Sequence, residues 1–176
     1  MIKIISLDTP EEDQGFVITR NNKIDEIALL MRAWYVSFEF KPLPVQGEYT
    51  SVLRFTAGTE NNGQMGDRQP AVFLAENTTK LYICTGLNDH RSYSFTSEAL
   101  PLDQWTTVVI KQEFVDSRYM YSIHINGVEV HSKHNQKPRR YENVKVYASD
   151  DFKDPANGFI RNLTYYNLTE GELFSG

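Results

Sequence analysis

The sequence predicts an all-β fold, an antiparallel sandwich or barrel with little helix, and three observations support this prediction. About ten to twelve segments with strand character follow one another at spacings of about 8–12 residues, with turn signals between them. Ten Tyr and ten Phe supply aromatic residues that strands favour. Residues 119–132 have the pattern of a hairpin with one apolar face, which needs a second layer to cover it.

The hairpin at residues 119–132 is the strongest local signal. Tyr121, Ile123 and Ile125 alternate with polar neighbours, which is the period of a half-buried strand. Asn126-Gly127 then supplies two residues that tolerate positive φ, as a type I′ turn requires.

A two-residue turn also sets the register of the hairpin. We therefore expect these facing pairs: Ile125 with Val128, Ile123 with Val130, and His124 with Glu129. The same alternation predicts that Val128 and Val130 point inward, whereas Glu129 and His131 point outward.

Residues 34–41 are the clearest single strand. Trp34, Val36, Phe38 and Phe40 point to one side of it, and prolines follow where it should end.

Residues 24–31 are ambiguous. Their apolar side chains recur at helical spacing, but over a window so short that it could also be a lead-in to the next strand. The remaining strand candidates are residues 3–7, 16–19, 51–57, 70–75, 80–85, 91–96, 105–111, 143–148 and 158–166. We expect Trp34, Phe38, Trp105, Ile123 and Val146 in the core.

Length and composition limit which classes of protein this chain can belong to. The 176 residues are enough for about one domain, which we take to be residues 1–176. The net charge of −5, with no basic block, argues against nonspecific nucleic-acid binding. No apolar run approaches the roughly 20 residues of a membrane span. The apolar start is too short for a signal peptide, so the chain is either cytosolic or has lost its signal. Cys84, the single cysteine, cannot close an internal disulfide.

The strand order in the second half resembles a known superfamily. A Trp opens a strand at residues 105–110, a hairpin with an Asn-Gly turn follows at 121–130, and a Gly-led strand closes the chain at 158–168. This progression is similar to the concanavalin A-like lectin and glucanase superfamily, above all its laminin G and pentraxin branches. The resemblance implies a two-sheet jelly-roll sandwich, in which residues 159–166 would lie next to residues 16–19. It covers residues 34–168, and the Cys pair that often ends laminin G modules is absent.

Catalysis is not favoured by the acidic residues. A glycosidase needs two carboxylates flanking the scissile bond, which on one strand means acids two or four residues apart. No strand candidate has such a pattern, and Glu170-Gly-Glu172 has the spacing but is expected to be a solvated tail. No nucleophile-elbow motif of the type Gly-x-Ser-x-Gly occurs either.

Calcium is the stronger chemical hypothesis, and it comes from the resemblance. Laminin G modules commonly hold a calcium ion at the rim of the sandwich. By strand order, Asp67 falls where the first family Asp would be, and Glu142 or Asn143 falls near the second. Calcium requires six to eight oxygen ligands, and the arginines nearby would oppose it. The alternative is that Asp67 caps a turn or pairs with an arginine.

Other candidate residues concern a ligand or a modification. Exposed Tyr35, Tyr82 and Tyr147 would stack on sugar rings, or would simply cover neighbouring strands. Arg68 and Asp89 are polar candidates for contacts with the same ligand. Asp89 is also a weaker calcium candidate. Of three Asn-x-Ser/Thr sequons, only the one at Asn77 lies in a predicted turn, which makes it the favoured glycosylation site.

The sequence therefore supports a non-catalytic extracellular recognition module that binds a glycan or a protein surface, with the assistance of calcium that the resemblance implies. One alternative is a glycan-active enzyme, of the glycoside hydrolase type, on the same fold. A second alternative is a structural or adhesive matrix domain without a small ligand. The sequence leaves the oligomeric state and the identity of the ligand open.

Overall fold

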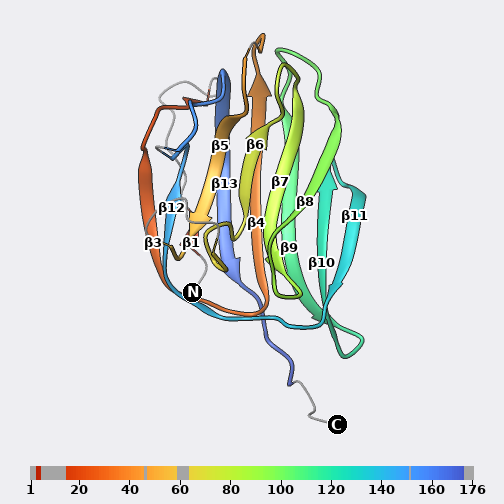
Figure 1. Cartoon of the computed structure of the whole chain (residues 1–176). Coiled ribbons are helices and arrows are strands. Elements are labelled where there is room, and N and C mark those ends of the chain that lie inside the picture. The colour runs from red at the N-terminus through yellow and green to blue at the C-terminus, as the bar shows by residue number, and fades with distance from the viewer. Residues whose placement is uncertain (1–2, 5–14, 46, 59–63, 151, 173–176) are drawn as a thin grey trace.

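The computed structural model of the chain describes residues 3–4, 15–45, 47–58, 64–150 and 152–172. Within this part of the chain, thirteen strands form two antiparallel sheets that lie face to face (Figure 1). Among the described residues there is no helix, and hence none that is long and apolar enough to cross a membrane. The predicted all-β sandwich of two antiparallel sheets is confirmed.

Sheet A has the strand order β1-β13-β4-β9-β10-β11, and β2 also pairs with β13. Its strands are β1 (Lys3–Ile4), β2 (Phe16–Val17), β4 (Trp34–Pro42), β9 (Thr106–Val115), β10 (Arg118–Ile125), β11 (Val128–Asn135) and β13 (Gly158–Asn167). Sheet B has the order β3-β12-β5-β6-β7-β8. Its strands are β3 (Lys23–Leu30), β5 (Thr50–Thr56), β6 (Ala71–Leu74), β7 (Lys80–Leu87), β8 (His90–Ala99) and β12 (Tyr141–Tyr147).

The core lies between the two sheets, and strand alternation builds it. Along β4, every second residue from Trp34 to Phe40 is buried, while the residues between them are half buried. Ile123 of sheet A and Val146 of sheet B belong to the same core cluster. The predicted burial of Trp34, Phe38, Ile123 and Val146 is confirmed.

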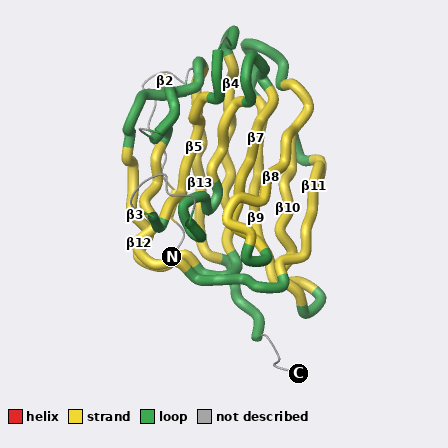
Figure 2. Tube along the Cα trace, in the orientation of Figure 1, coloured by secondary structure: helices red, strands yellow, loops and turns green. Residues whose placement is uncertain are grey.

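The first and last strands of the chain meet in sheet A. Phe159 of β13 pairs with Val17 of β2, as the resemblance implied. The other side of β13 pairs with β4, so the strand is held between two earlier parts of the chain. Of the strand predicted at residues 3–7, Lys3–Ile4 pairs with β13, and residues 5–7 lie outside the described part of the chain. Figure 2 shows the long strands joined by loops at both ends of the sandwich.

Residues 24–31, which the sequence left ambiguous, lie almost entirely in strand β3. This strand pairs antiparallel with β12 along most of its length, from Leu30 opposite Tyr141 to Lys23 opposite Tyr147. Only Leu30 is fully buried in it. The helical spacing of its apolar residues is therefore overridden by pairing with β12 at the edge of sheet B.

The turn of the predicted hairpin is confirmed, but part of its register is wrong. Asn126 and Gly127 both have positive φ, at 49° and 78°, and Ile125 faces Val128 as expected. Beyond His124 and Glu129, however, Ile123 faces His131 and not Val130. A β-bulge leaves Val130 as the extra residue and changes which side chains of β11 face the core.

The bulge reverses the predicted facing of β11 from His131 onward. Val128 and Val130 were expected inward, yet they are 63% and 41% exposed at the margin of sheet A. His131 was expected outward, yet its ring stacks on Tyr93 and Phe95 of sheet B, and its Nε2 lies 2.7 Å from the Tyr93 hydroxyl. Burial and the nearby Lys133 lower the pKa of His131. An aromatic and polar contact thus joins the two sheets where two buried valines were expected.

Trp105 is a second correction, because it is half buried and does not belong to the core cluster. It stands just before β9 begins and packs outside sheet A. The guanidinium carbon of Arg161 lies 4.0 Å from its ring centre, and Lys41 Nζ lies 5.3 Å from it. Cation–π contacts on the surface of sheet A therefore hold this ring.

The segment after β13 is a third correction, because Glu170 is not in a solvated tail. Its side chain is 10% exposed and pairs with Arg140, whose Nη2 lies 2.6 Å from Oε2. The Arg32 backbone N–H donates to Oε1 at 2.6 Å, and the Tyr119 hydroxyl donates to the carbonyl of Gly171 at 2.8 Å. The hydrogen bond from Arg140 and the charge of both arginines hold the pKa of Glu170 below its usual range.

Replacing Gly127 by Val should lower the free energy of unfolding by about 1–2 kcal/mol, because a β-branched residue resists positive φ. A Cβ at this position would meet no atom within 4 Å, so the loss reflects backbone strain. Denaturant titration measures it, and Ser132→Val at an exposed position of β11 is the control, with little expected change. An unchanged midpoint for Gly127→Val would contradict the type I′ turn.

Replacing Glu170 by Gln should lower the melting temperature at neutral pH, through a loss of roughly 1–3 kcal/mol from charge-assisted hydrogen bonds. A carboxyl whose pKa is lowered on folding contributes stability above its unfolded pKa of about 4.5 and loses it as the pH falls through the folded value. The difference between wild type and variant should therefore shrink below about pH 4.5. Glu113→Gln, which removes an exposed partner of Lys111, is the control with a small effect. A difference independent of pH would exclude the ionic contribution of Glu170.

Candidate functional site

A small apolar cluster lies on the outer face of sheet B, away from the main core. On β6 and β7, Val72, Leu74, Leu81 and Ile83 point into the sandwich, so their neighbours point outward. The buried outward residues are Ala71, Phe73 and Cys84, with Tyr82 packed against them. This face of sheet B therefore carries an apolar floor that other residues must cover.

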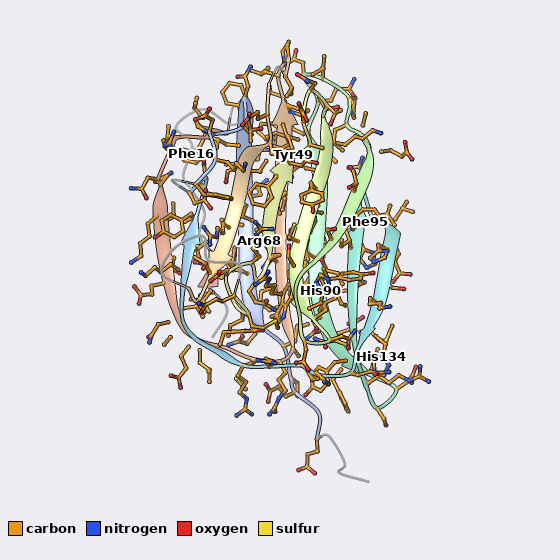
Figure 3. All side chains as sticks on the ribbon, in the orientation of Figure 1. Phe16, Tyr49, Arg68, His90, Phe95 and His134 are labelled. Carbon is orange, nitrogen blue, oxygen red and sulfur yellow. The ribbon has the colours of Figure 1, made fainter. Side chains whose placement is uncertain are left out.

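Three further segments cover this floor and form a pocket on it. Tyr49 comes from just before β5, Arg68 from the segment between β5 and β6, and Phe152 and Lys153 from the segment between β12 and β13. Figure 3 shows Tyr49 and Arg68 on the same face of the molecule, in front of the strands of sheet B. The cavity has a volume of about 260 Å³, and we call it the Arg68 pocket. Its lining residues are Tyr49, Arg68, Phe73, Tyr82, Phe152 and Lys153.

The aromatic rings of the Arg68 pocket contact one another at steep angles. Tyr49 lies edge-on to Tyr82, with ring centres 5.4 Å apart and planes at 73°. The ring centres of Phe73 and Tyr82 are 6.4 Å apart, and the Phe73 side chain is buried. Tyr49 and Phe152 remain 37% and 38% exposed. The pocket thus presents accessible apolar ring surface to solvent, together with the polar ends of its tyrosines.

Arg68 is fixed by neutral groups. Its Nη1 donates to the Ser92 hydroxyl at 2.8 Å and lies 3.8 Å from Cys84 Sγ. Its guanidinium carbon lies 5.6 Å from the ring centre of Phe73. Burial raises the pKa of the Cys84 thiol, so at neutral pH it is a protonated neighbour and not a nucleophile.

A buried ion pair positions the segment that carries Phe152 and Lys153. Arg54 Nη1 lies 2.8 Å from Asp150 Oδ2, with side chains only 5% and 3% exposed. The other oxygen of Asp150 accepts the backbone N–H groups of Phe152 and Lys153, at 3.0 and 3.4 Å. Arg54 also donates from Nε to the carbonyl of Asp67 at 2.9 Å, next to Arg68. One arginine on β5 therefore connects two walls of the Arg68 pocket.

A second cavity of about 420 Å³ adjoins the Arg68 pocket, and we call it the polar pocket. The two cavities share Tyr49, Phe152 and Lys153. The polar residues that only the second cavity contains are Glu48, Thr50, Asp154 and Asn157. Asp154 also pairs with Arg20, whose Nη1 lies 2.9 Å from Oδ1. The combined site therefore has aromatic rings and Arg68 in one half and hydroxyl, amide and carboxylate groups in the other, with Lys153 shared between them.

The structure brings together two of the five ligand-binding candidates from the sequence, Arg68 and Tyr82. Tyr35 lies in sheet A, stacked on Tyr166 at 4.7 Å, and lines an apolar pocket of about 300 Å³ between β3 and β13. Tyr147 is on β12 and does not line the Arg68 pocket. Asp89 stands in the turn between β7 and β8, where Lys137 and Arg139 pair with it.

The calcium candidates do not form a cluster among the residues that the structure describes. Asp67 is 3% exposed, and its Oδ2 accepts the Gln64 backbone N–H at 2.7 Å. Glu142 and Asn143 are exposed on β12. No group of three His, Cys, Asp or Glu side chains in the described ranges is placed to hold a metal ion. Calcium, which takes six to eight oxygen ligands, stays a prediction for these residues.

Asn77 stands in an exposed turn, with a positive φ of 54°. Its side-chain oxygen accepts the Gly47 backbone N–H at 2.8 Å. Its role as a glycosylation site remains a prediction.

Sequence reasoning missed Tyr49, Phe73, Phe152 and Lys153. For Phe73 a signal existed, because the turn after β6 pairs Phe73 with Tyr82 across the hairpin and so places two aromatics side by side on one face. Tyr49, Phe152 and Lys153 carry no such signal. They come from loops, and only the folded chain brings those loops to β6 and β7.

Comparisons with known proteins identify the fold. No family model matches the chain, and no curated protein matches it either. Similar solved structures include a heptameric SAP-like pentraxin from Limulus polyphemus, with 16% identity, a TM-score of 0.55, and coverage of 88% of this chain and 76% of that one.

Two further similar structures belong to carbohydrate-active proteins. The first is the CBM40 of a Ruminococcus gnavus IT-sialidase bound to α2,3-sialyllactose, with 13% identity, a TM-score of 0.57, and coverage of 89% and 92% of the two chains. The second is domain 4 of AbnA, an extracellular GH43 arabinanase of Geobacillus stearothermophilus, in complex with arabinotriose. It shares 17% identity, with a TM-score of 0.53 and coverage of 95% and 75%. At these identities the likeness shows the fold alone, and this chain has the concanavalin A-like jelly-roll fold.

Proposed function

We propose that this protein is a non-catalytic, extracellular glycan-binding module whose ligand occupies the Arg68 pocket. The observation that carries the proposal is the group of partly exposed aromatic rings, Tyr49, Tyr82 and Phe152, around a cavity on the outer face of a sheet. Sugar rings have apolar C–H faces and polar edges, so aromatic surface and hydrogen-bonding groups at one cavity suit them. The mixture of a few polar groups with apolar lining is typical of small-molecule sites.

The similar structures support the proposal. Two of them are domains that their structures show with an oligosaccharide, sialyllactose in one case and arabinotriose in the other. One belongs to an extracellular enzyme, which agrees with an extracellular setting. This support is by analogy of fold, and the chemistry of the pocket itself determines the ligand.

The enzyme alternative receives less support from the site. No carboxylate lines the Arg68 pocket among the described residues. In the polar pocket, Asp154 pairs with Arg20, and Glu48 is exposed. A glycosidase requires a carboxylic acid and a second carboxylate on opposite sides of the bond that is cleaved. The site is better suited to holding a sugar than to cleaving it.

Replacing Tyr82 by Ala should weaken glycan binding by about tenfold or more, because a buried aromatic contact contributes more than 1 kcal/mol. The ligand is first identified on a glycan array, and its affinity is then measured by calorimetry. Tyr35→Ala in the opposite sheet is the control and should leave the affinity unchanged. Melting curves show that both variants are folded. Equal affinity of wild type and Tyr82→Ala would remove the Arg68 pocket from the binding site, and an array without hits would favour a structural or adhesive domain.

Calcium assistance, which the resemblance implies, makes a separate prediction. A ligand that binds only the folded state stabilises it, by about 2.7 kcal/mol at 100 times its Kd. Millimolar calcium should then raise the melting temperature, Asp67→Asn should reduce the response, and magnesium should substitute poorly. A melting curve indifferent to calcium and to chelator would remove the metal and leave Asp67 as the acceptor for the Gln64 backbone N–H.

A further inference from the structure

Arg68 differs from most other arginines of the chain in its partners. Ion pairs hold Arg20, Arg32, Arg54, Arg139, Arg140 and Arg161. Arg68 has no carboxylate partner among the described residues, although the whole chain carries a net charge of −5. Its neighbours are a hydroxyl, a thiol and an aromatic ring. A half-buried cation whose described neighbours include no counter-ion, in an acidic chain, is suited to an anion from outside.

The guanidinium of Arg68 is also pre-organised. The hydrogen bond to Ser92 fixes Nη1, and the guanidinium carbon lies 5.6 Å from the centre of the Phe73 ring. A guanidinium has five N–H donors in a rigid fork that matches a planar carboxylate. Since the side chain is already held, little further conformational entropy is lost when an anion binds.

A second cation stands at the same cavity. Lys153 Nζ lies 4.9 Å from the ring centre of Phe152, and both residues line the Arg68 pocket. Asp150 fixes the backbone of this segment, so Lys153 is held near the pocket without a carboxylate partner among the described residues. Two cations and several aromatic rings thus surround a volume of about 260 Å³.

The adjoining polar pocket differs from the Arg68 pocket in having carboxylates, besides the Lys153 that both cavities share. It contains Glu48 and Asp154 besides Thr50 and Asn157. Arg20 compensates the charge of Asp154, so Glu48 is the carboxylate that would repel a second anionic group, and both carboxylates can accept hydrogen bonds from sugar hydroxyls. The two cavities together therefore distinguish an acidic unit from a neutral one.

We propose that the site binds an oligosaccharide whose acidic sugar places its carboxylate on Arg68 and whose next, neutral sugar occupies the polar pocket. This inference rests on the proposed glycan-binding function and specifies the ligand class of the same site. Arg68 provides the charge-assisted hydrogen bonds, Tyr82 and Phe152 the apolar ring surface, and Glu48 the discrimination against a second acid. Both sialic acids and uronic acids carry the required carboxylate.

Calorimetry at pH 7 on the whole chain tests the proposal with pairs of acidic and neutral probes. The sialic acid pair is 3′-sialyllactose and lactose, and the uronic acid pair is glucuronosyl-xylose and xylobiose. In at least one pair, the acidic probe should bind about tenfold or more tightly than its neutral counterpart, which is the contribution of a charge-assisted pair. The pair that shows the preference identifies the source of the carboxylate. Raising the salt concentration should reduce the preference.

Variants show whether Arg68 is responsible for the preference. Arg68→Met keeps an unbranched side chain but removes the charge, so the acidic probe should lose most of its preference, Lys153 being the cation that remains, while the affinity of the neutral probe should stay unchanged. Arg68→Lys keeps the charge without the planar fork and should give an intermediate value. If Arg68→Met fails to fold, Arg68→Lys tests the role of the guanidinium in its place. Arg118→Met removes an equal charge from an exposed position of β10 and should change nothing.

Two further probes test the carboxylate and the neutral second unit. Lactose-3′-sulfate should bind more weakly than 3′-sialyllactose, and equal or tighter binding would overturn the assignment of a carboxylate. Digalacturonic acid should bind more weakly than glucuronosyl-xylose, and Glu48→Gln should reduce that difference. Suppose that the acidic and neutral probes bind the wild type equally well and that Tyr82→Ala abolishes the binding of both. That result would overturn this inference and leave the proposed function intact. Failure of every probe and of the glycan array would overturn both.

Discussion

The burial of one apolar face of each sheet against the other is the constraint on which the rest of this structure depends. Along β4, alternation sends Trp34 and Phe38 inward and leaves the odd-numbered positions outside. The same period on β6 and β7 sends Phe73 and Tyr82 to the outer face of sheet B. The main core does not shield the apolar surface of this outer face from water, so loops have to cover it. The candidate site is the place where this covering is incomplete.

The buried pair of Arg54 and Asp150 shows how polar groups are used in that covering. Two charges at 5% and 3% exposure carry a large desolvation cost, so the pair is weak evidence for stability. Its geometry has a clearer role, because Asp150 fixes the backbone of Phe152 and Lys153 while Arg54 holds the carbonyl of Asp67. The wall residues of the Arg68 pocket therefore depend on a contact beneath them that no ligand would touch.

The sequence was most informative where neighbours along the chain determine structure. Period-2 alternation predicted β4, and Asn126-Gly127 predicted the type I′ turn. It was wrong about His131, because a bulge of one residue reverses the facing of β11 from this histidine onward and no residue signals it. Arg68 and Tyr82 could be named as candidates, but their proximity depends on segments that are far apart in sequence. Glu170 was misjudged for the same reason, since Arg32 and Arg140 are distant along the chain.

The bulge in β11 also bears on how this molecule meets other molecules. β11 and β3 are terminal strands of their sheets, and such strands offer unpaired backbone groups to any extended chain. In β11 the bulge at Val130 interrupts the regular ladder, and exposed Glu129 and Lys133 flank it. In β3, Lys23 and Glu26 form an exposed charge pair. Irregular backbone and charge are the features by which sheet proteins discourage edge-to-edge aggregation. The residue that disturbs the hairpin thereby protects the margin of the sandwich.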